Sequence, residues 1–228
     1  PRTSSAASDV YKRQMMDAAK KAMVPPFEIS VFPDPAGSFT TAAAMVAFTE
    51  KVLKEKFNTT LKNKRVVIYG GKGIVGGISS IMCAKAGAKC IIIGYDGITN
   101  VKNKANEYKS RFDVDIEPGD GSNDDLNSSF LPQADIIFCA ARAGTQVLSL
   151  EQMKLAKMVK VLADVNAVPP AGIEGVGLKD DAIEHQCGAF SIGPLTSGDL
   201  KVKTQYKMFE EMCATEKPLY LNFSQALD

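Results

Sequence analysis

The chain has 228 residues, of which 45% are hydrophobic and 23% are charged, and these values are typical of a globular protein. Its 27 Lys and Arg residues nearly balance its 26 Asp and Glu residues, so the charge gives no reason to expect nucleic acid or an anionic membrane as a partner. No apolar run reaches the length of about 18 residues that a membrane-spanning helix needs.

The first 14 residues are left out of the fold prediction. The chain begins with Pro1 rather than Met, and residues 1–14 are polar, rich in Ser and without periodicity. We interpret them as a non-native or disordered leader, with a natural transit peptide as the alternative. Residues 15–24 predict a helix, which two prolines terminate. In residues 27–32 apolar and polar side chains alternate, which is typical of a strand.

A turn and a helix follow this strand. The turn is predicted at residues 33–37, where Pro, Asp and Gly cluster. The helix is predicted over 42–56, and Ser38, Thr40 or Thr41 is a suitable cap for it. Its alanines and valines along one side form an apolar stripe that a core would bury.

From residue 61 onward, short apolar runs alternate with helical segments. The runs predict buried strands at 65–69, 89–93, 114–116, 134–140 and 159–163, with helices at 74–86, 100–112 and 149–158. This order implies right-handed crossovers and a parallel sheet. The predicted fold class is therefore α/β, a doubly wound parallel sheet of the Rossmann type.

The remaining segments define the predicted domains. Residues 164–177 form a loop, 189–192 a strand and 200–212 a helix. We assign residues 58–195 to the dinucleotide-binding domain. The flanking segments, 15–57 and 196–228, are expected to pack together as part of a second α/β domain for the substrate.

Glycines after the first buried strand indicate a nucleotide site. Gly-x-Gly-x-x-Gly lies between a predicted strand and a predicted helix. The first glycine permits a tight turn, the second lets the backbone approach a pyrophosphate, and the third lets the helix pack closely. Free N–H groups at the helix start would bind the phosphates. The predicted cofactor-binding residues are Gly71, Lys72, Gly73, Ile74, Val75 and Gly76; the alternative is a glycine-rich turn without a ligand.

An acidic residue after the second buried strand bears on the choice of cofactor. Asp96 follows Gly76 by 20 residues. A carboxylate there accepts hydrogen bonds from the adenine ribose and repels a 2′-phosphate, which favours NAD over NADP. The alternative is a solvated turn aspartate. Lys102 and Lys104 are near enough in sequence to accommodate a phosphate, so NADP stays open.

Three further residues follow later strands at the same sheet edge, where ligands bind in open α/β sheets. Ala140 and Ala141 are small enough for a nucleotide to lie over them, with close packing as the alternative. The Asn166 amide is able to hold a carboxamide or a ring, and a structural turn is the alternative. These three are predicted to bind the cofactor.

The sequence does not indicate a metal site or a nucleophilic mechanism. Five cysteines are scattered without a Cys-x-x-Cys pair, at positions 83, 90, 139, 187 and 213. This count favours reduced thiols in a cytoplasmic protein and argues against a metal site. The single histidine, His185, lies among polar residues and is predicted to be a surface residue. We find no Gly-x-Ser-x-Gly, no Cys–His neighbourhood and no P-loop lysine motif, which is compatible with direct hydride transfer to a cofactor.

Four strings occur in one order along the chain: DPxGxxTTAA at 34–43, GGxGxVG at 70–76, ADxNAxPPxGIxG at 163–175 and LKxK at 200–203. Together they resemble the methylene-tetrahydromethanopterin dehydrogenases of one-carbon metabolism, some of which also accept methylene-tetrahydrofolate. The resemblance covers about residues 25 to 210. It implies hydride transfer from the methylene group of a reduced pterin to NAD or NADP, and a homo-oligomer such as a trimer.

The resemblance also implies roles for individual residues. Thr40 and Thr41 would lie near the pterin, and Lys201 would match the active-site lysine of the family, although lysines on a solvated face are the ordinary reading. NADP-specific relatives carry a basic residue where this chain has Asp96, which supports NAD or dual use. The early part of the substrate domain is expected to be missing, which leaves open whether this chain alone turns over.

Two other functions stay open at this point. One is a different NAD(P)-dependent dehydrogenase, of the methylene-tetrahydrofolate or shikimate type. The other is a non-catalytic NAD(P)-binding module that uses the same glycine loop.

Overall fold

The computed structural model of the chain describes residues 16–222 and 225–226. The predictions for residues 1–14, and for the first residue of the predicted helix 15–24, lie outside these ranges. The helix itself is present over residues 16–22. In the described part of the chain, no helix combines the length and the apolar character that crossing a lipid bilayer requires.

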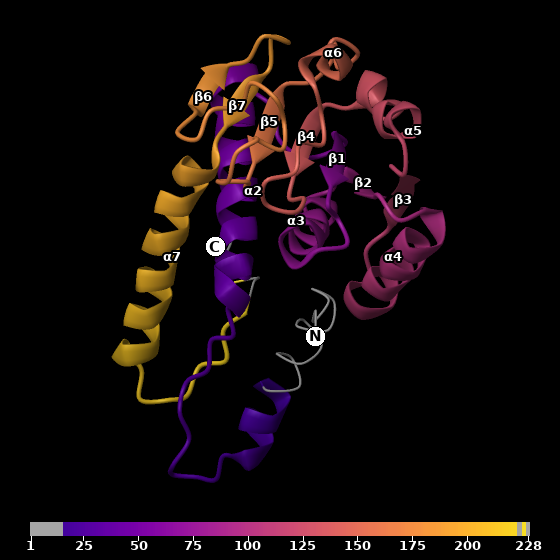
Figure 1. Cartoon of the computed structure of the whole chain (residues 1–228). Coiled ribbons are helices and arrows are strands. Elements are labelled where there is room, and N and C mark those ends of the chain that lie inside the picture. The colour runs from indigo at the N-terminus through magenta and orange to yellow at the C-terminus, as the bar shows by residue number, and fades with distance from the viewer. Residues whose placement is uncertain (1–15, 223–224, 227–228) are drawn as a thin grey trace.

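One sheet organises the molecule (Figure 1). Its seven strands are β1 (Arg65–Tyr69), β2 (Lys89–Gly94), β3 (Ile116–Asp120), β4 (Ile136–Cys139), β5 (Val161–Asp164), β6 (Asp181–Glu184) and β7 (Phe190–Ile192). They are ordered β3-β2-β1-β4-β5-β7-β6, and all neighbours are parallel except β6 and β7. The winding reverses between β1 and β4, where open α/β sheets form a ligand crevice. The predicted fold class is confirmed.

Helices cover both faces of the sheet. The longer ones are α2 (Ser38–Phe57), α3 (Ile74–Lys85), α4 (Ile98–Phe112) and α7 (Pro194–Ala214), and the short ones are α5 (Asp124–Ser128), α6 (Leu150–Met153), η1 (Pro35–Gly37) and η2 (Leu131–Gln133). Alternate residues of β1 face opposite cores, because side chains alternate along a strand. Val66 and Ile68 join the core under α2, α3 and α4, whereas Val67 and Tyr69 join the core with η2 and α6.

Helices from the two flanking segments contact each other. Helices α2 and α7 lie side by side (Figure 1), and an isolated parallel bridge joins Val31 to Tyr220. However, α2 also packs on α3 and on strands β5 and β7, so its buried side belongs to the main core. The division into a nucleotide domain and a substrate domain stays a prediction.

Two predicted elements differ near the start of the chain. Residues 27–32 form no strand beyond the bridge at Val31, because Phe27 and Ile29 are exposed and have no sheet to pack on. Helix α2 begins at Ser38, four residues earlier than predicted, so Thr40 and Thr41 lie inside it and do not cap it. The carboxylate of Asp34 takes the capping role, and accepts a hydrogen bond from the Phe39 N–H at 2.8 Å.

The later elements differ from the predicted ones more in their length than in their type. The predicted helix at 149–158 is the single turn α6, closed by a capping box. The third strand lies at Ile116–Asp120 rather than 114–116. Strand β6 was not predicted, because it is a mostly exposed edge strand whose acidic sequence carries no apolar alternation.

The prediction that His185 is a surface residue is wrong. It is only 4% exposed, because the turn between β6 and β7 folds its ring inward. Its Nε2 lies 2.9 Å from the Glu174 carbonyl oxygen, and its Nδ1 lies 3.1 Å from Cys187 Sγ. The expectation of no Cys–His neighbourhood is therefore wrong as well, although the pair lies at the β6 edge of the sheet.

Candidate functional site

A tight glycine turn connects β1 to α3. Gly70 has a φ of 77°, and its carbonyl accepts a hydrogen bond of 2.9 Å from the Gly73 N–H. A Cβ atom on Gly70 would lie 2.4 Å from the Ala140 carbonyl oxygen, so no other residue fits there. The tight turn therefore falls on Gly70, whereas the sequence pattern assigned it to Gly71.

The other glycines of the loop permit close packing. A Cβ on Gly71 would lie 2.4 Å from Ile92 Cβ, and one on Gly76 would lie 2.7 Å from the Gly70 carbonyl oxygen. A Cβ on Gly77 would overlap the Tyr108 hydroxyl, which itself donates to the Gly71 carbonyl at 3.2 Å. These contacts bring the start of α3 against β1 and β2, as the third glycine of the pattern was predicted to do.

The start of α3 suits a diphosphate. Gly73 is the N-cap in extended conformation, and among the described residues no side chain caps this helix. The N–H groups of its first turn, at Ile74, Val75 and Gly76, have no partner within the helix by geometry, and they carry partial positive charge. Bare main-chain donors at the reversal point of the sheet fit the phosphates of a dinucleotide.

Lys72 in this loop reaches the acidic residue after β2. Its Nζ forms an ion pair with Asp96 Oδ1, and the Asn100 amide donates to Asp96 Oδ2 at 3.0 Å. Burial raises the pKa of Asp96, but the Lys72 and Asn100 contacts outweigh this and hold the pKa below its usual value. Lys72 and Asp96, two predicted cofactor residues, are thus brought together, and Asn100 is a partner that the sequence did not indicate.

Ala140, Ala141 and Asn166 follow β4 and β5 at the carboxyl edge of the sheet. The two alanines are half-buried beside the glycine turn, and the Ala140 N–H donates to the Tyr69 carbonyl at 2.9 Å. Asn166 is buried, and its Oδ1 accepts from the Gly144 N–H at 3.1 Å. Its Nδ2 donates to a carbonyl in its own loop, so the amide holds this loop in place. A direct contact between Asn166 and a cofactor stays a prediction.

Asp164 at the end of β5 organises the same loop. It is 1% exposed, and its two oxygens accept hydrogen bonds from the Asn166 N–H at 2.8 Å and the Ile173 N–H at 2.9 Å. Burial raises the pKa of Asp164, although these main-chain donors act in the opposite direction. No role was predicted for Asp164, although an aspartate that ends an apolar strand is a usable signal in the sequence.

A second polar cluster joins the start of α2 to α7. Asp34 Oδ2 accepts hydrogen bonds from the Thr40 hydroxyl at 2.6 Å and from the Gln205 amide at 2.8 Å. The Thr41 hydroxyl donates to the Gly37 carbonyl at 2.7 Å. Thr40 is fully buried, so its hydroxyl serves this network, while Thr41 is half-buried.

Lys201 lies directly over Gly37. A Cβ atom on Gly37 would lie 2.2 Å from Lys201 Nζ, and the φ of 71° at Gly37 also disfavours any other residue. This contact joins the DPxG turn to the LKxK string. The structure thus brings Lys201, Thr40 and Thr41, the predicted catalytic residues, to one place. We call these three residues, together with Asp34 and Gln205, the Lys201 cluster.

The two clusters lie on the same side of the sheet. Helix α7 begins two residues after β7, and Lys201 is seven residues into it, ~10 Å beyond the strand ends at 1.5 Å per residue. The end of α2 leads through residues 58–64 to the start of β1, so α2 begins on the side where β1 ends. Both groups of residues therefore lie on the side of the sheet where its parallel strands end.

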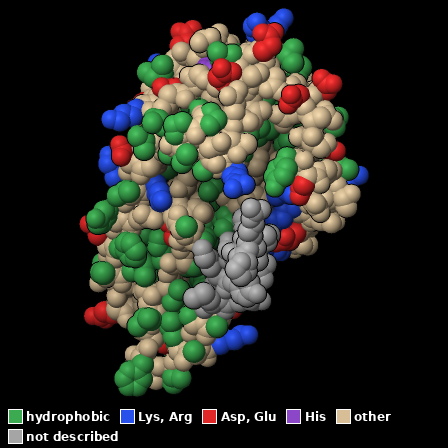
Figure 2. All heavy atoms as spheres, viewed as in Figure 1, with side chains coloured by type: hydrophobic (Ala, Val, Ile, Leu, Met, Phe, Trp, Pro, Cys, Tyr) green, Lys and Arg blue, Asp and Glu red, His purple; other side chains and the backbone are tan. Residues whose placement is uncertain are grey.

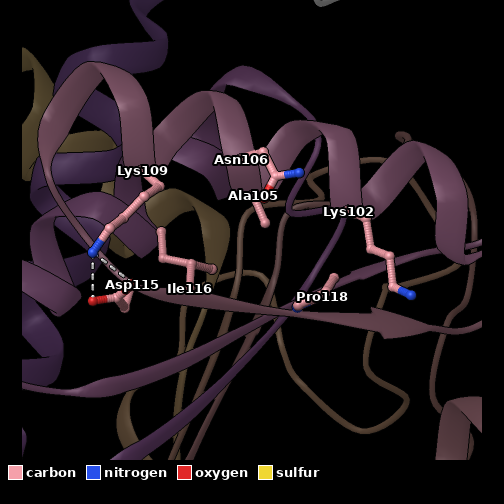
Figure 3. A pocket seen from close by; sticks show the side chains of 7 residues that line it. All are labelled: Lys102, Ala105, Asn106, Lys109, Asp115, Ile116 and Pro118. Atoms are coloured by element: carbon pink, nitrogen blue, oxygen red, sulfur yellow. Dashed lines mark hydrogen bonds and ion pairs between the residues drawn. The ribbon is translucent and has the colours of Figure 1, made fainter.

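A shallow pocket elsewhere takes no part in this site (Figure 3). It lies between α4 and the edge strand β3, and is lined by Lys102, Ala105, Asn106, Lys109, Asp115, Ile116 and Pro118. Lys109 Nζ lies 2.8 Å from the Asp115 carboxylate across it. Nor do three His, Cys, Asp or Glu side chains come together as metal ligands among the residues that the structure describes.

Comparison with known proteins gives two relatives by sequence from Methylorubrum extorquens. The chain is 42% identical over 213 residues to its NAD(P)-dependent methylenetetrahydromethanopterin dehydrogenase, which covers 93% of this chain and 72% of the relative. It is 30% identical over 190 residues to its bifunctional protein MdtA, which covers 83% of this chain and 64% of that protein. No protein-family model matches the chain.

Solved structures support the fold. The L-tryptophan dehydrogenase of Nostoc punctiforme superposes with a TM-score of 0.51 at 14% identity, covering 99% of this chain and 62% of that structure. At so low an identity the likeness concerns the fold alone, and it agrees with the Rossmann-like architecture described above.

Proposed function

This chain belongs to the family of NAD(P)-dependent methylenetetrahydromethanopterin dehydrogenases, and we propose that it oxidises the methylene group of a reduced pterin with NAD or NADP. The substrate is methylene-tetrahydromethanopterin, with methylene-tetrahydrofolate as a second candidate. One observation carries the proposal beyond family membership. The bare glycine turn follows β1 at the reversal point of the sheet, and the predicted catalytic residues Thr40, Thr41 and Lys201 lie together where α2 begins against α7.

The chain's own residues position the cofactor. The open main-chain N–H groups of Ile74, Val75 and Gly76 hold the diphosphate, and Asp96 accepts hydrogen bonds from the ribose hydroxyls. Ala140 and Ala141 leave room for the nucleotide above the sheet edge, and Asn166 and Asp164 hold the loop beside it. Bound NAD or NADP supplies the hydride acceptor. Asp96 taken alone favours NAD, because its charge opposes a 2′-phosphate.

The substrate stabilises its own charge in this reaction. Its methylene carbon lies between two nitrogens, so loss of hydride gives a methenyl cation that is shared over N–C–N. The protein therefore mainly has to hold two rings face to face. A lysine ammonium beside that cation would oppose the oxidation. Lys201, placed against Gly37 at the start of α2, accordingly organises the pocket and does not stabilise the cation.

We also propose that the chain forms a homo-oligomer in the cytoplasm. Three large apolar side chains on α7, Val202, Tyr206 and Phe209, are 47%, 67% and 51% exposed. Figure 2 shows hydrophobic side chains along this side of the molecule. Contact between subunits would cover them, and light scattering on the purified chain measures the subunit number. The free cysteines of the described residues support a reducing compartment.

The test is reduction of NAD and NADP by the chain with each methylene-pterin, followed by nicotinamide absorbance. Turnover with either pterin supports the proposal, and cofactor binding without turnover favours the non-catalytic module. The key variant is Lys201→Met, for which we expect kcat/KM to fall about tenfold or more because the pocket loses its organising group. Lys203→Met removes an exposed lysine of the same helix and serves as the matched control. Unchanged kinetics in Lys201→Met would contradict the role of Lys201.

A further inference from the structure

Lys72 lies beside Asp96, the residue predicted to bind the adenine ribose. It comes from the loop between β1 and α3, whereas Asp96 and Asn100 come from the loop after β2 and the start of α4. The ion pair between Lys72 and Asp96 joins the two loops. Asn100 holds the other carboxylate oxygen, so Asp96 is fixed from both sides.

The packing lets Lys72 lie across the end of β2. A Cβ atom on Gly94 would lie 2.6 Å from Val101 Cγ2, 3.2 Å from Lys72 Cε and 3.4 Å from Asp96 Oδ1. The missing side chain of Gly94 therefore leaves room both for Val101 and for the lysine stem. The Lys72 ammonium also lies 5.7 Å from the centre of the exposed Tyr95 ring, which adds a weak attraction.

The positive charge of Lys72 changes how the Asp96 carboxylate interacts with a cofactor. An isolated carboxylate after β2 accepts the ribose hydroxyls and repels a 2′-phosphate. Here the carboxylate and the ammonium neutralise each other in the free protein. The Lys72 side chain is 25% exposed and the Asp96 side chain 35% exposed, so a ligand can reach both groups. A flexible lysine is able to turn from the carboxylate to a phosphate without a change in the backbone.

We propose that Lys72 and Asp96 form an exchangeable ion pair that admits both cofactors. With NAD, Lys72 stays on Asp96 and the carboxylate accepts the ribose hydroxyls. With NADP, Lys72 leaves Asp96 for the 2′-phosphate, and Asn100 retains the carboxylate. This inference rests on the proposed function, because it assigns the ribose end of the same cofactor site.

The experiment measures binding rather than turnover. Calorimetry on the full chain uses two probes that lack nicotinamide, ADP-ribose and 2′-phospho-ADP-ribose. For Lys72→Met, the affinity for 2′-phospho-ADP-ribose falls about tenfold or more, because a charge-assisted contact is lost. Its affinity for ADP-ribose stays within about twofold, since the main-chain donors of the glycine loop remain. Asp96→Asn has the opposite effect, and favours 2′-phospho-ADP-ribose over ADP-ribose.

Two further variants make the result decisive. Lys85→Met removes a lysine from the far end of α3 and leaves both affinities unchanged. Lys102→Met tests the nearby lysine of α4 as the phosphate partner. Equal losses for both probes in Lys72→Met, no loss for either, or a selective loss in Lys102→Met would overturn the proposal while the dehydrogenase function stands. If the unaltered chain binds neither probe, the proposed function fails with it.

Discussion

Gly37 shows how a single residue without a side chain determines the position of another. Its φ of 71° and the lysine that lies over it both exclude a Cβ atom. The sequence showed Gly37 in a turn and in the DPxGxxTTAA string, and showed Lys201 in a lysine pair whose role came only from the family resemblance. The contact between them explains why position 37 requires a residue without a side chain. The local sequence does not show this contact.

We predict that Gly37→Ala weakens both stability and turnover. The positive φ costs about 1 kcal/mol for a residue with a Cβ, and the methyl group displaces Lys201 from its place. Urea unfolding measures the stability, and kcat/KM with NAD and the methylene-pterin measures the effect on the site.

The matched control for this variant is Gly198→Ala. Gly198 lies in α7, where a Cβ would meet nothing within 4 Å. Alanine there stabilises the helix by about 0.5–1 kcal/mol, and turnover should not change. If Gly37→Ala behaved like Gly198→Ala, the packing of Lys201 on Gly37 would not matter to the protein.

At the scale of elements, Asp135 ties three parallel strands together where they begin. Its Oδ2 accepts a hydrogen bond of 3.0 Å from the Arg65 N–H at the start of β1, and its Oδ1 accepts one of 2.9 Å from Lys160 Nζ before β5. The side chain is 18% exposed. Burial raises the pKa of Asp135, but the Arg65 and Lys160 contacts outweigh this and hold the pKa below its usual value.

A depressed carboxyl pKa has a definite effect on acid stability. The ionised group stabilises the folded state above the unfolded pKa of about 3.9, and this contribution is lost as the pH falls through the lower, folded pKa. We predict that Asp135→Asn lowers the free energy of unfolding by about 1–3 kcal/mol at pH 7. The difference from the unaltered chain should shrink below pH of about 4.

Unfolding in urea at a series of pH values measures this difference. Asp113→Asn is the control, because the Asp113 side chain is 98% exposed and lies 4.0 Å from its lysine partner. A pH-independent loss in Asp135→Asn would mean that packing at the strand ends, and not charge, holds them together.

At the scale of the whole molecule, the sheet and the segment before α2 differ in how firmly they are held. The central strands β1, β4 and β5 are buried along nearly their whole length. The segment 23–33 has one bridge, at Val31, and its apolar residues Val24, Phe27 and Ile29 are 64%, 83% and 66% exposed. Few buried contacts hold this segment.

We predict a corresponding gradient in hydrogen exchange. Amides of β1, β4 and β5 should exchange only on global unfolding, whereas those of residues 23–30 should exchange many times faster through local opening. Exchange followed by mass spectrometry on the full chain resolves the two regions. Equal protection would show that 23–33 is part of the same cooperative unit as the sheet.

Much of the fold followed from local pattern. The strands at 65–69 and 89–93, and the helix after the glycine loop, were predicted within one or two residues because unbroken apolar runs and glycines are short-range signals. The family and the dehydrogenase function are confirmed by a relative of 42% identity. Two of the failures, the strand at 27–32 and the surface position of His185, concern segments whose burial depends on distant partners.

The sequence by itself determined the α/β class, the parallel core and the place of the glycine loop, because periodicity and backbone freedom are properties of neighbouring residues. Only the tertiary structure decided that Gly70 makes the tight turn and that Lys72 pairs with Asp96. It also decided that Asp34 accepts a hydrogen bond from Gln205, which is 171 residues away in the sequence. These contacts depend on how loops and helices meet at one edge of the sheet. No local pattern encodes that meeting, because it arises from the packing of the whole chain.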